Sequence, residues 1–242
     1  MFFALVQNYA HAGVTSLVND RSLGTVNSAD IPSSIDHEIV PNFGTHHQEA
    51  GFDFDSDDSF QKYLSPDHPL HDIDYIPTDL VPIDSNFTAN DSRSFKLRQE
   101  ASIYFADMAW HFRHAFSGDR LYISSAYRSI WLQDYLIKQW CALIKCAAIG
   151  TSEHQAWLAV DIKVIAKSGK AYSLDAAYPN KYSDRLKANA ATFGFHNTYQ
   201  KWVAVDGKII EWRHRRYLWT TLAKILTENN QTLAEYYASI QY

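Results

Sequence analysis

Apolar residues recur every three or four positions between Leu97 and Ala115, and this spacing constrains the fold more than any other feature of the chain. The stripe consists of Leu97, Ala101, Phe105, Met108, Phe112 and Ala115. Residues three and four apart share one face of an α-helix, so the stripe predicts an amphipathic helix packed on a core. Gly118 follows the stripe and is expected to end that helix.

The rest of the chain mixes strand and helix patterns. The expected elements are a strand at 121–125, a helix at 129–147, a strand at 158–163, a helix at 183–193 with Ser183 as its N-cap, a hairpin of 202–205 and 208–212 about Asp206-Gly207, and a helix at 218–240. Helices followed by a small antiparallel sheet predict an α+β domain.

The first 60 residues lack a sustained apolar period and are rich in Ser, Asp, Asn and His. That composition predicts a leader or flexible arm over residues 1–60, with a solvated acidic linker at 53–59, and one domain over 61–242. The chain starts with an apolar run of only six residues, 1–6, and Ala10-His11-Ala12 further on has the Ala-x-Ala form of a cleavage site. This is part of a signal-peptide pattern, but no basic residue precedes it, so a signal peptide stays an open question.

Composition excludes several classes of partner. The formal net charge is −5, so no basic excess exists for a nucleic-acid backbone, and no apolar run is long enough to span a membrane. We expect a monomer. Cys141 and Cys146 lie five apart in the predicted helix, about 140° around its axis, so we expect two unpaired buried thiols.

Histidines and carboxylates form two clusters, His154 with Asp161 and Glu211 with His214. Catalytic zinc takes three protein ligands and keeps a position for water. Two neutral imidazoles and one carboxylate would leave the ion a net positive charge, which suits a Lewis acid. A bend between Glu211 and His214 would place the glutamate beside the metal-bound water as a base. On spacing alone the signal for a metal site is weak, because most His/Asp/Glu groupings of this kind are structural or face solvent.

Three motifs resemble those of the VanY-type D-alanyl-D-alanine carboxypeptidases, which are related to D-Ala-D-Ala dipeptidases and to the hedgehog amino-terminal fold. The similarity covers about residues 61–220, with the motifs in the family's order. The metal-binding signature is resembled by Ser152-Glu153-His154-Gln155-x-x-Leu158-Ala159-Val160-Asp161, the second signature by Glu211-x-x-His214-x-Arg216-Tyr217, and the substrate-binding segment by Ser125-Ala126-Tyr127-Arg128-Ser129 followed by Gln133.

The resemblance implies a small antiparallel sheet that carries a zinc site and is covered by helices. It implies that Zn²⁺ is held by His154, Asp161 and His214. It further implies Glu211 as the general base and Arg128 as the contact for the substrate carboxylate or the developing oxyanion.

Further substrate contacts implied by the resemblance are Gln133, Ser152 and Ser125. A helix-surface amide is an equally open reading for Gln133, and a loop-ordering hydroxyl is equally open for Ser152.

The implied function is a zinc-dependent D,D-carboxypeptidase that removes the terminal D-alanine from peptidoglycan stem peptides, and such a substrate implies an extracytoplasmic location. An L,D-carboxypeptidase or a peptidoglycan endopeptidase on the same scaffold is the nearest alternative. A non-catalytic, zinc-containing cell-wall-binding module is the second. A hedgehog-type signalling domain would not need the Arg128 segment.

Three positions depart from the family pattern. Trp157 stands where the family usually has Gly, and Arg213 stands where it usually has Trp before the metal-binding histidine. Ala148-Ile149 replaces the usual Arg-Pro before Gly150. If the backbone at 157 requires a positive φ, Trp is strained there; otherwise its indole narrows the pocket. These departures concern substrate preference and keep the non-catalytic alternative open.

Overall fold

A five-stranded antiparallel sheet lies at the centre of the structure, a computed structural model that describes residues 51–88, 95–139, 146–175, 180–201 and 208–241. Four strands follow one another in the order β3 (Arg120–Ser125), β4 (Ala159–Ile165), β7 (His214–Tyr217) and β6 (Phe195–His196). The fifth, β5 (Ala171–Ser173), also pairs with β4. A separate antiparallel pair consists of β1 (Leu80–Pro82) and β2 (Lys96–Arg98).

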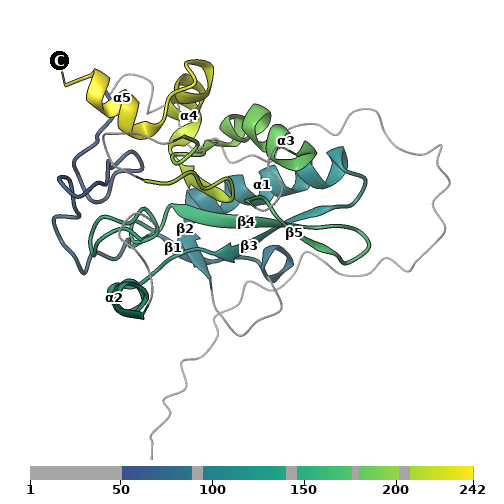
Figure 1. Ribbon diagram of the computed structural model, residues 1–242, viewed down its shortest axis with the longest axis horizontal. Coiled ribbons are helices and arrows are strands. Elements are labelled where there is room, and N and C mark those ends of the chain that lie inside the picture. Colours follow the sequence, from purple (N-terminus) through teal and green to yellow (C-terminus); the bar gives the residue numbers. More distant parts are fainter. Residues whose placement is uncertain (1–50, 89–94, 140–145, 176–179, 202–207, 242) are drawn as a thin grey trace, which may run out of the picture. The chain divides into compact units, whose positions relative to one another are not determined.

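Five α-helices accompany these strands. They are α1 (Gln99–Ala115), α2 (Ile130–Gln139), α3 (Lys181–Asn189), α4 (Trp219–Glu228) and α5 (Leu233–Ser239), with short 3₁₀ turns at η2 (Ser85–Phe87) and η3 (Ala190–Phe193). Figure 1 shows α1, α3 and α4 on one side of β4 and α2 on the other. The α+β class with small antiparallel sheets is therefore confirmed.

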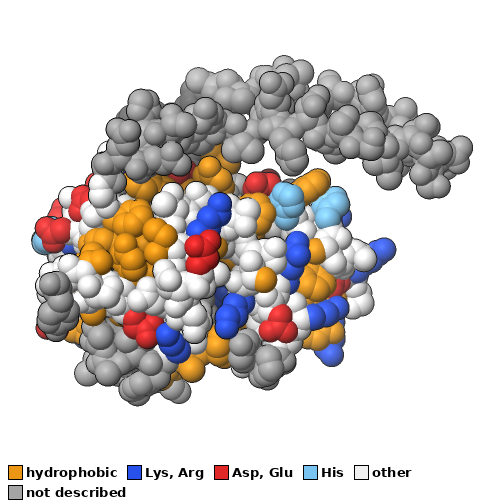
Figure 2. Space-filling view, turned by 90° about the horizontal axis from the view of Figure 1, so that it is seen from above, with side chains coloured by type: hydrophobic (Ala, Val, Ile, Leu, Met, Phe, Trp, Pro, Cys, Tyr) orange, Lys and Arg blue, Asp and Glu red, His pale blue; other side chains and the backbone are white. Residues whose placement is uncertain are grey.

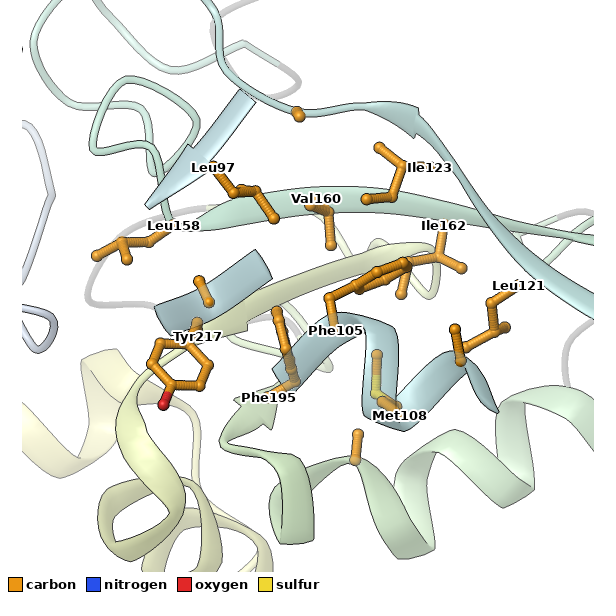
Figure 3. Close-up of a cluster of buried hydrophobic side chains, with 14 of the residues drawn as sticks. Leu97, Phe105, Met108, Leu121, Ile123, Leu158, Val160, Ile162, Phe195 and Tyr217 are labelled. Carbon is orange, nitrogen blue, oxygen red and sulfur yellow. The ribbon is translucent and has the colours of Figure 1, made fainter. Parts of the chain in front are cut away.

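The main core lies between α1 and the sheet. Phe105 and Met108 of α1 pack into the same buried cluster as Val160 and Ile162 of β4, as Figure 3 shows. Side chains alternate between the two faces of a strand, so Asp161, between these two core residues, points to the opposite face. The core thereby fixes the direction of a predicted metal ligand.

A second hydrophobic cluster ties residues before the predicted domain to the C-terminal helices. Phe52 packs edge-on and Phe54 packs at a tilt against Tyr236, and Tyr63 stacks on Tyr237 with ring centroids 4.3 Å apart. The compact unit begins at Ala50. Residues 51–60, which we expected to belong to a flexible arm, are therefore held by aromatic packing. The sequence did not reveal this, because the two phenylalanines stand among aspartates.

Several predicted boundaries need correction. The last helix is two helices, because Asn230 adopts a φ of 50° and Thr232 starts α5 with a capping box that includes Glu235. The helix predicted from Ser183 begins earlier, because Asn180 is the N-cap and Ser183 is its capping-box partner. In the predicted hairpin, residues 202–207 lie outside the described residues, and 208–212 do not form a strand.

The helix predicted over 129–147 also ends too late. In the structure α2 ends at Gln139, and Cys146 and Ala147, beyond six residues that are not described, are not helical. Cys146 is disulfide-bonded, whereas Cys141, the only other cysteine of the sequence, lies outside the described residues. The expectation of unpaired thiols is therefore wrong, because the 140° separation on which it rested holds only within a continuous helix.

The described surface carries charges of both signs. On the face shown in Figure 2, Lys and Arg side chains are interspersed with Asp and Glu, and hydrophobic side chains form one large patch and several smaller ones. Among the helices of the described part of the chain, none combines the length and the apolar character needed to cross a membrane.

Candidate active site

Three predicted metal ligands meet on the face of the sheet opposite α1. Asp161 of β4 and His214, the first residue of β7, are directly opposed in the strand register, and His154 lies in the turn before β4. One ligand atom from each lies within 4.8 Å of the other two. Asp161 Oδ1 is 3.6 Å from His154 Nε2 and 3.6 Å from His214 Nδ1. Sheet register thus joins Asp161 and His214, which are 53 positions apart in sequence.

The remaining nitrogen of each histidine has a partner of its own. His154 Nδ1 lies 2.7 Å from the carbonyl oxygen of Ala126, and His214 Nε2 lies 2.7 Å from Glu153 Oε2. Both acceptors favour a proton on the nitrogen that faces them, so each ring in its neutral form has its lone pair on the other nitrogen, His154 Nε2 and His214 Nδ1. Metal-binding histidines are commonly oriented in this way.

The centre of the cluster fits a divalent cation. Asp161 Oδ1 and His214 Nδ1 are buried and have no hydrogen-bond partner among the described residues. Buried polar atoms are costly when unpaired, so two converging ones indicate a missing ligand. Two imidazole nitrogens and one carboxylate oxygen are a donor set that suits zinc and leaves room for water.

The protonation of the cluster without metal follows from burial and charge. Burial lowers the pKa of His154 to about 4. Burial also opposes protonation of His214, but Asp161 and Glu153 outweigh it and raise the pKa of His214 to about 9. The two histidines together hold the pKa of Asp161 well below its usual range despite its burial. A metal would therefore displace a proton from His214 when it binds.

Glu211 reaches the same cavity through a turn. The amide of His214 donates to the carbonyl of Glu211 at 3.2 Å across the turn at 212–213, which is the bend that the sequence required. Glu211 lines the cavity together with His154 and His214. Its side chain is 13% exposed, and this burial raises its pKa. A largely buried carboxylate with a raised pKa is a stronger proton acceptor than an exposed one, as a general base requires.

Arg128 is oriented from the connection between β3 and α2. Its Nη2 donates to Asp161 Oδ2 at 3.1 Å, its Nε donates to Ser125 Oγ at 3.4 Å, and its amide donates to the carbonyl of His154 at 3.2 Å. The guanidinium also lines the cavity. These bonds hold one edge of the fork, so a fixed positive charge faces the space beside the predicted ligands.

The lesser predicted contacts separate in the structure. Ser152 lines the cavity and is buried. Ser125 meets Arg128 and does not line the cavity, so it orients the guanidinium. Gln133 is fully buried and does not line the cavity either; its Nε2 donates to the carbonyl of Ala147 at 2.6 Å. That bond fastens α2 to the segment before Gly150.

Four further residues contribute to the site and were not predicted from the sequence. Tyr199 lines the cavity and stacks on the ring of His214 at 4.5 Å between centroids, and Lys208 lines it as well. Glu153 bonds to His214, and Thr198 Oγ1 donates to Glu153 Oε2 at 2.6 Å. Glu153 could have been found as the buried carboxylate inside the first motif, whereas the other three have no local signal.

The departures from the family pattern have distinct structural outcomes. Trp157 adopts a φ of 61°, so its backbone does take the conformation that favours glycine, and its indole does not line the cavity. Arg213 meets three carboxylates: its Nη2 donates to Glu211 Oε2 at 2.9 Å, its Nη1 contacts Asp175, and its Nε lies 3.6 Å from Asp161 Oδ1. A second cation therefore lies beside the predicted base.

Comparison with known proteins decides what this arrangement belongs to. The sequence profile of the VanY D-alanyl-D-alanine carboxypeptidases matches residues 94–220, more than half of the chain. The chain belongs to the VanY family. It is accordingly a metallopeptidase of the carboxypeptidase type, and the recognition made from its three motifs is confirmed. A search of curated proteins finds no match.

Solved structures show the same fold. The LD-carboxypeptidase LdcB, whose structure addresses peptidoglycan recognition, is 25% identical with a TM-score of 0.66 over 75% of this chain and 87% of its own. The D,D-dipeptidase VanXYg, bound to a D-Ala-D-Ala phosphinate analogue, is 24% identical with a TM-score of 0.58 over 73% and 69%. A D,D-pentapeptidase VanY variant bound to Zn(II) is 23% identical with a TM-score of 0.51 over 72% and 96%.

Proposed function

We propose that this VanY-family chain is a zinc-dependent D,D-carboxypeptidase that removes the terminal D-alanine from peptidoglycan stem peptides. The observation that carries the proposal is the shared cavity. His154 and His214 line it, and so do Glu211 and Arg128 from two other segments of the chain. Those groups supply a metal site, a base and a fixed cation within one small space, which is what hydrolysis of a peptide bond beside a free carboxylate requires.

In the proposed mechanism zinc, held by His154, Asp161 and His214, supplies Lewis acidity to water and to the scissile carbonyl. Glu211 accepts the proton that water loses as its oxygen attacks the carbonyl carbon. Glu211 then returns that proton to the amine nitrogen as the carbon–nitrogen bond breaks and D-alanine departs. Burial raises the pKa of Glu211, which makes its carboxylate a better proton acceptor than an exposed glutamate.

Arg128 serves the anionic parts of the substrate. A C-terminal carboxylate or a developing oxyanion would accept from the donors of the guanidinium that Asp161 and Ser125 leave unused. Ser152 lines the same space and offers a hydroxyl for a further substrate contact. Gln133 is less suited to such a contact, because its side chain is buried against Ala147.

An L,D-carboxypeptidase is the second candidate. It is favoured by the likeness to the LD-carboxypeptidase LdcB, which is 25% identical with a TM-score of 0.66. Both candidates act on stem peptides outside the cytoplasm, and the disulfide-bonded Cys146 supports an oxidising compartment. We also propose that the chain acts as a monomer and that the segment before the compact unit is a leader or arm.

The test is digestion of defined muropeptides by zinc-loaded protein, with products read by mass spectrometry. A D,D-carboxypeptidase converts pentapeptide to tetrapeptide and releases D-alanine. An L,D-carboxypeptidase leaves the pentapeptide intact and shortens the tetrapeptide, and an endopeptidase splits cross-linked dimers. Stoichiometric zinc and tight muropeptide binding without products would instead favour the non-catalytic wall-binding module. Glu211→Gln should abolish turnover and keep zinc, and turnover that survives it refutes the mechanism.

A further inference from the structure

Glu153 is a buried carboxylate that the proposed mechanism does not use. Only 3% of its surface is exposed. Its Oε2 lies 2.7 Å from His214 Nε2 and accepts from Thr198 Oγ1 at 2.6 Å, while its Oε1 accepts from Arg216 Nη1 at 3.0 Å. Three groups from β7 and the segment after β6 thus converge on one carboxylate that directly precedes His154 in the chain.

The geometry sets which nitrogen of His214 carries a proton. With Glu153 on its Nε2 side, the neutral imidazole that would bind a metal keeps its hydrogen there and directs the Nδ1 lone pair toward Asp161 and His154. Arg216 is fully buried and neutralises Glu153, so the carboxylate can stay ionised without solvent. An amide at position 153 could still accept from the ring, but without the charge that fixes this tautomer.

We propose that Glu153 is a positioning residue that fixes the tautomer and orientation of His214 for metal binding. The inference rests on the proposed zinc site. It does not require that the substrate be a D,D-peptide, because it concerns how the site is assembled before any substrate arrives. Carboxylates behind metal-binding histidines contribute 10- to 100-fold to metal affinity as an order of magnitude, which is about the effect expected here.

Zinc affinity, measured by competition with a chromophoric chelator, tests the proposal without reference to turnover. Glu153→Gln should weaken zinc binding about 10- to 100-fold. The exposed Glu228→Gln is the matched control and should leave affinity unchanged. If wild type binds zinc and Glu153→Gln binds it equally well, the positioning role is refuted. If the wild-type protein binds no zinc, the zinc-dependent function proposed above is refuted, and the role of Glu153 falls with it.

A second variant covers the case in which Glu153→Gln does not fold. Thr198→Val removes only one of the hydrogen bonds to Glu153 and should lower zinc affinity by a smaller factor. Nitrogen chemical shifts of His214 in the zinc-loaded protein give a direct reading of the tautomer. They should report a hydrogen on Nε2 in wild type, and a hydrogen on Nδ1 would overturn the proposal.

Two tryptophans carry a separate inference, because their backbones adopt a conformation that glycine favours. Four non-glycine residues in the described part of the chain have a positive φ, and two of these are Trp157 at 61° and Trp219 at 63°. Asn230 is among the others and belongs to a residue type that tolerates this region, whereas a bulky side chain there is an outlier. Two such tryptophans in one domain call for a common cause.

The surroundings of Trp157 fit its side chain poorly. Its indole Nε1 is buried with no hydrogen-bond partner among the described residues. Its ring lies parallel to that of Tyr127 with centroids only 3.2 Å apart, closer than the optimal carbon contact of about 3.5–4.0 Å. The family usually has glycine at this position. Glycine would remove the positive-φ strain, the unpaired indole nitrogen and the close ring contact at once.

We infer that the gene encodes glycine at positions 157 and 219 through UGA codons. UGA is a stop signal in the standard genetic code and specifies tryptophan in some variant codes and glycine in others. The codons of the gene and the peptide masses of the protein made in its own cells test this. UGA codons with glycine masses at both positions support the inference. A UGG codon or a tryptophan mass at either position overturns it.

Discussion

Replacing Arg216 by Met tests whether the buried carboxylate behind His214 depends on this guanidinium. Arg216 is fully buried, donates to Glu153 Oε1 at 3.0 Å through Nη1, and contacts the carbonyl of Lys62 through Nη2. Methionine keeps most of the volume but removes the charge, so Glu153 is left buried without its cation. Breaking a buried ion pair in this way costs about 3–5 kcal/mol.

The structure places the expected cost near the lower end of that range. Thr198 still donates to Glu153, and His214, whose pKa is raised to about 9, stays protonated without metal and offsets part of the lost charge. We therefore expect the free energy of unfolding to fall by about 3 kcal/mol. For a domain of this size the corresponding drop in Tm is about 6–12 °C.

Urea denaturation of the metal-free protein, followed by tryptophan fluorescence, measures this cost. Arg120→Met, on the exposed end of β3, is the matched control and should change the free energy of unfolding by less than about 0.5 kcal/mol. In the double variant with Glu153→Gln the loss should be smaller than the sum of the single losses, because the orphaned charge is gone. A loss below about 1 kcal/mol for Arg216→Met, or full additivity, would show that Glu153 does not depend on the charge of Arg216.

Three further predictions concern the cavity and the core. Arg213→Trp should raise kcat/KM several-fold in steady-state assays, because it removes the guanidinium 2.9 Å from Glu211; a decrease would contradict the assignment of Glu211 as base. Arg128→Lys keeps the charge but loses the fork and should lower kcat/KM about 100-fold with zinc content unchanged, whereas an unchanged kcat/KM would remove Arg128 from the site. Burial lowers the pKa of His196 from 6.5 to about 4, so the unfolded chain binds its proton first and the free energy of unfolding should fall by about 3 kcal/mol between pH 6.5 and 4. Urea titrations at several pH values check this, and a His196→Gln variant with the same pH slope would contradict it.

The sequence predicted the elements whose patterns are local. The stripe from Leu97 gave α1 almost to the residue, and the alternation around Asp161 gave β4. Predicted helix boundaries were wrong where a capping residue sets the start of the helix. Asn180 caps α3 three residues before the predicted N-cap, and Thr232 caps α5 inside a stretch that we predicted as one continuous helix.

The site residues that lie within the three motifs could be predicted from the sequence. The resemblance to VanY placed His154, Asp161 and His214 together, and the structure does bring them within 4.8 Å. The resemblance could not predict Tyr199, because a ring that stacks on His214 from a separate loop has no fixed spacing to the motifs. For Gln133 the motif and the structure point to different contacts, since burial against the backbone of Ala147 depends on how α2 packs.

The central claim is that a single zinc ion is bound between two imidazoles and an aspartate beside a free glutamate. An anomalous difference map recorded at the zinc absorption edge, from crystals of the zinc-loaded protein, tests it most directly. We expect one strong peak bounded by His154, Asp161 and His214, with Glu211 nearby but not bound to the ion. A peak at another group of side chains, or Glu211 among the ligands in place of one of these three, would contradict it.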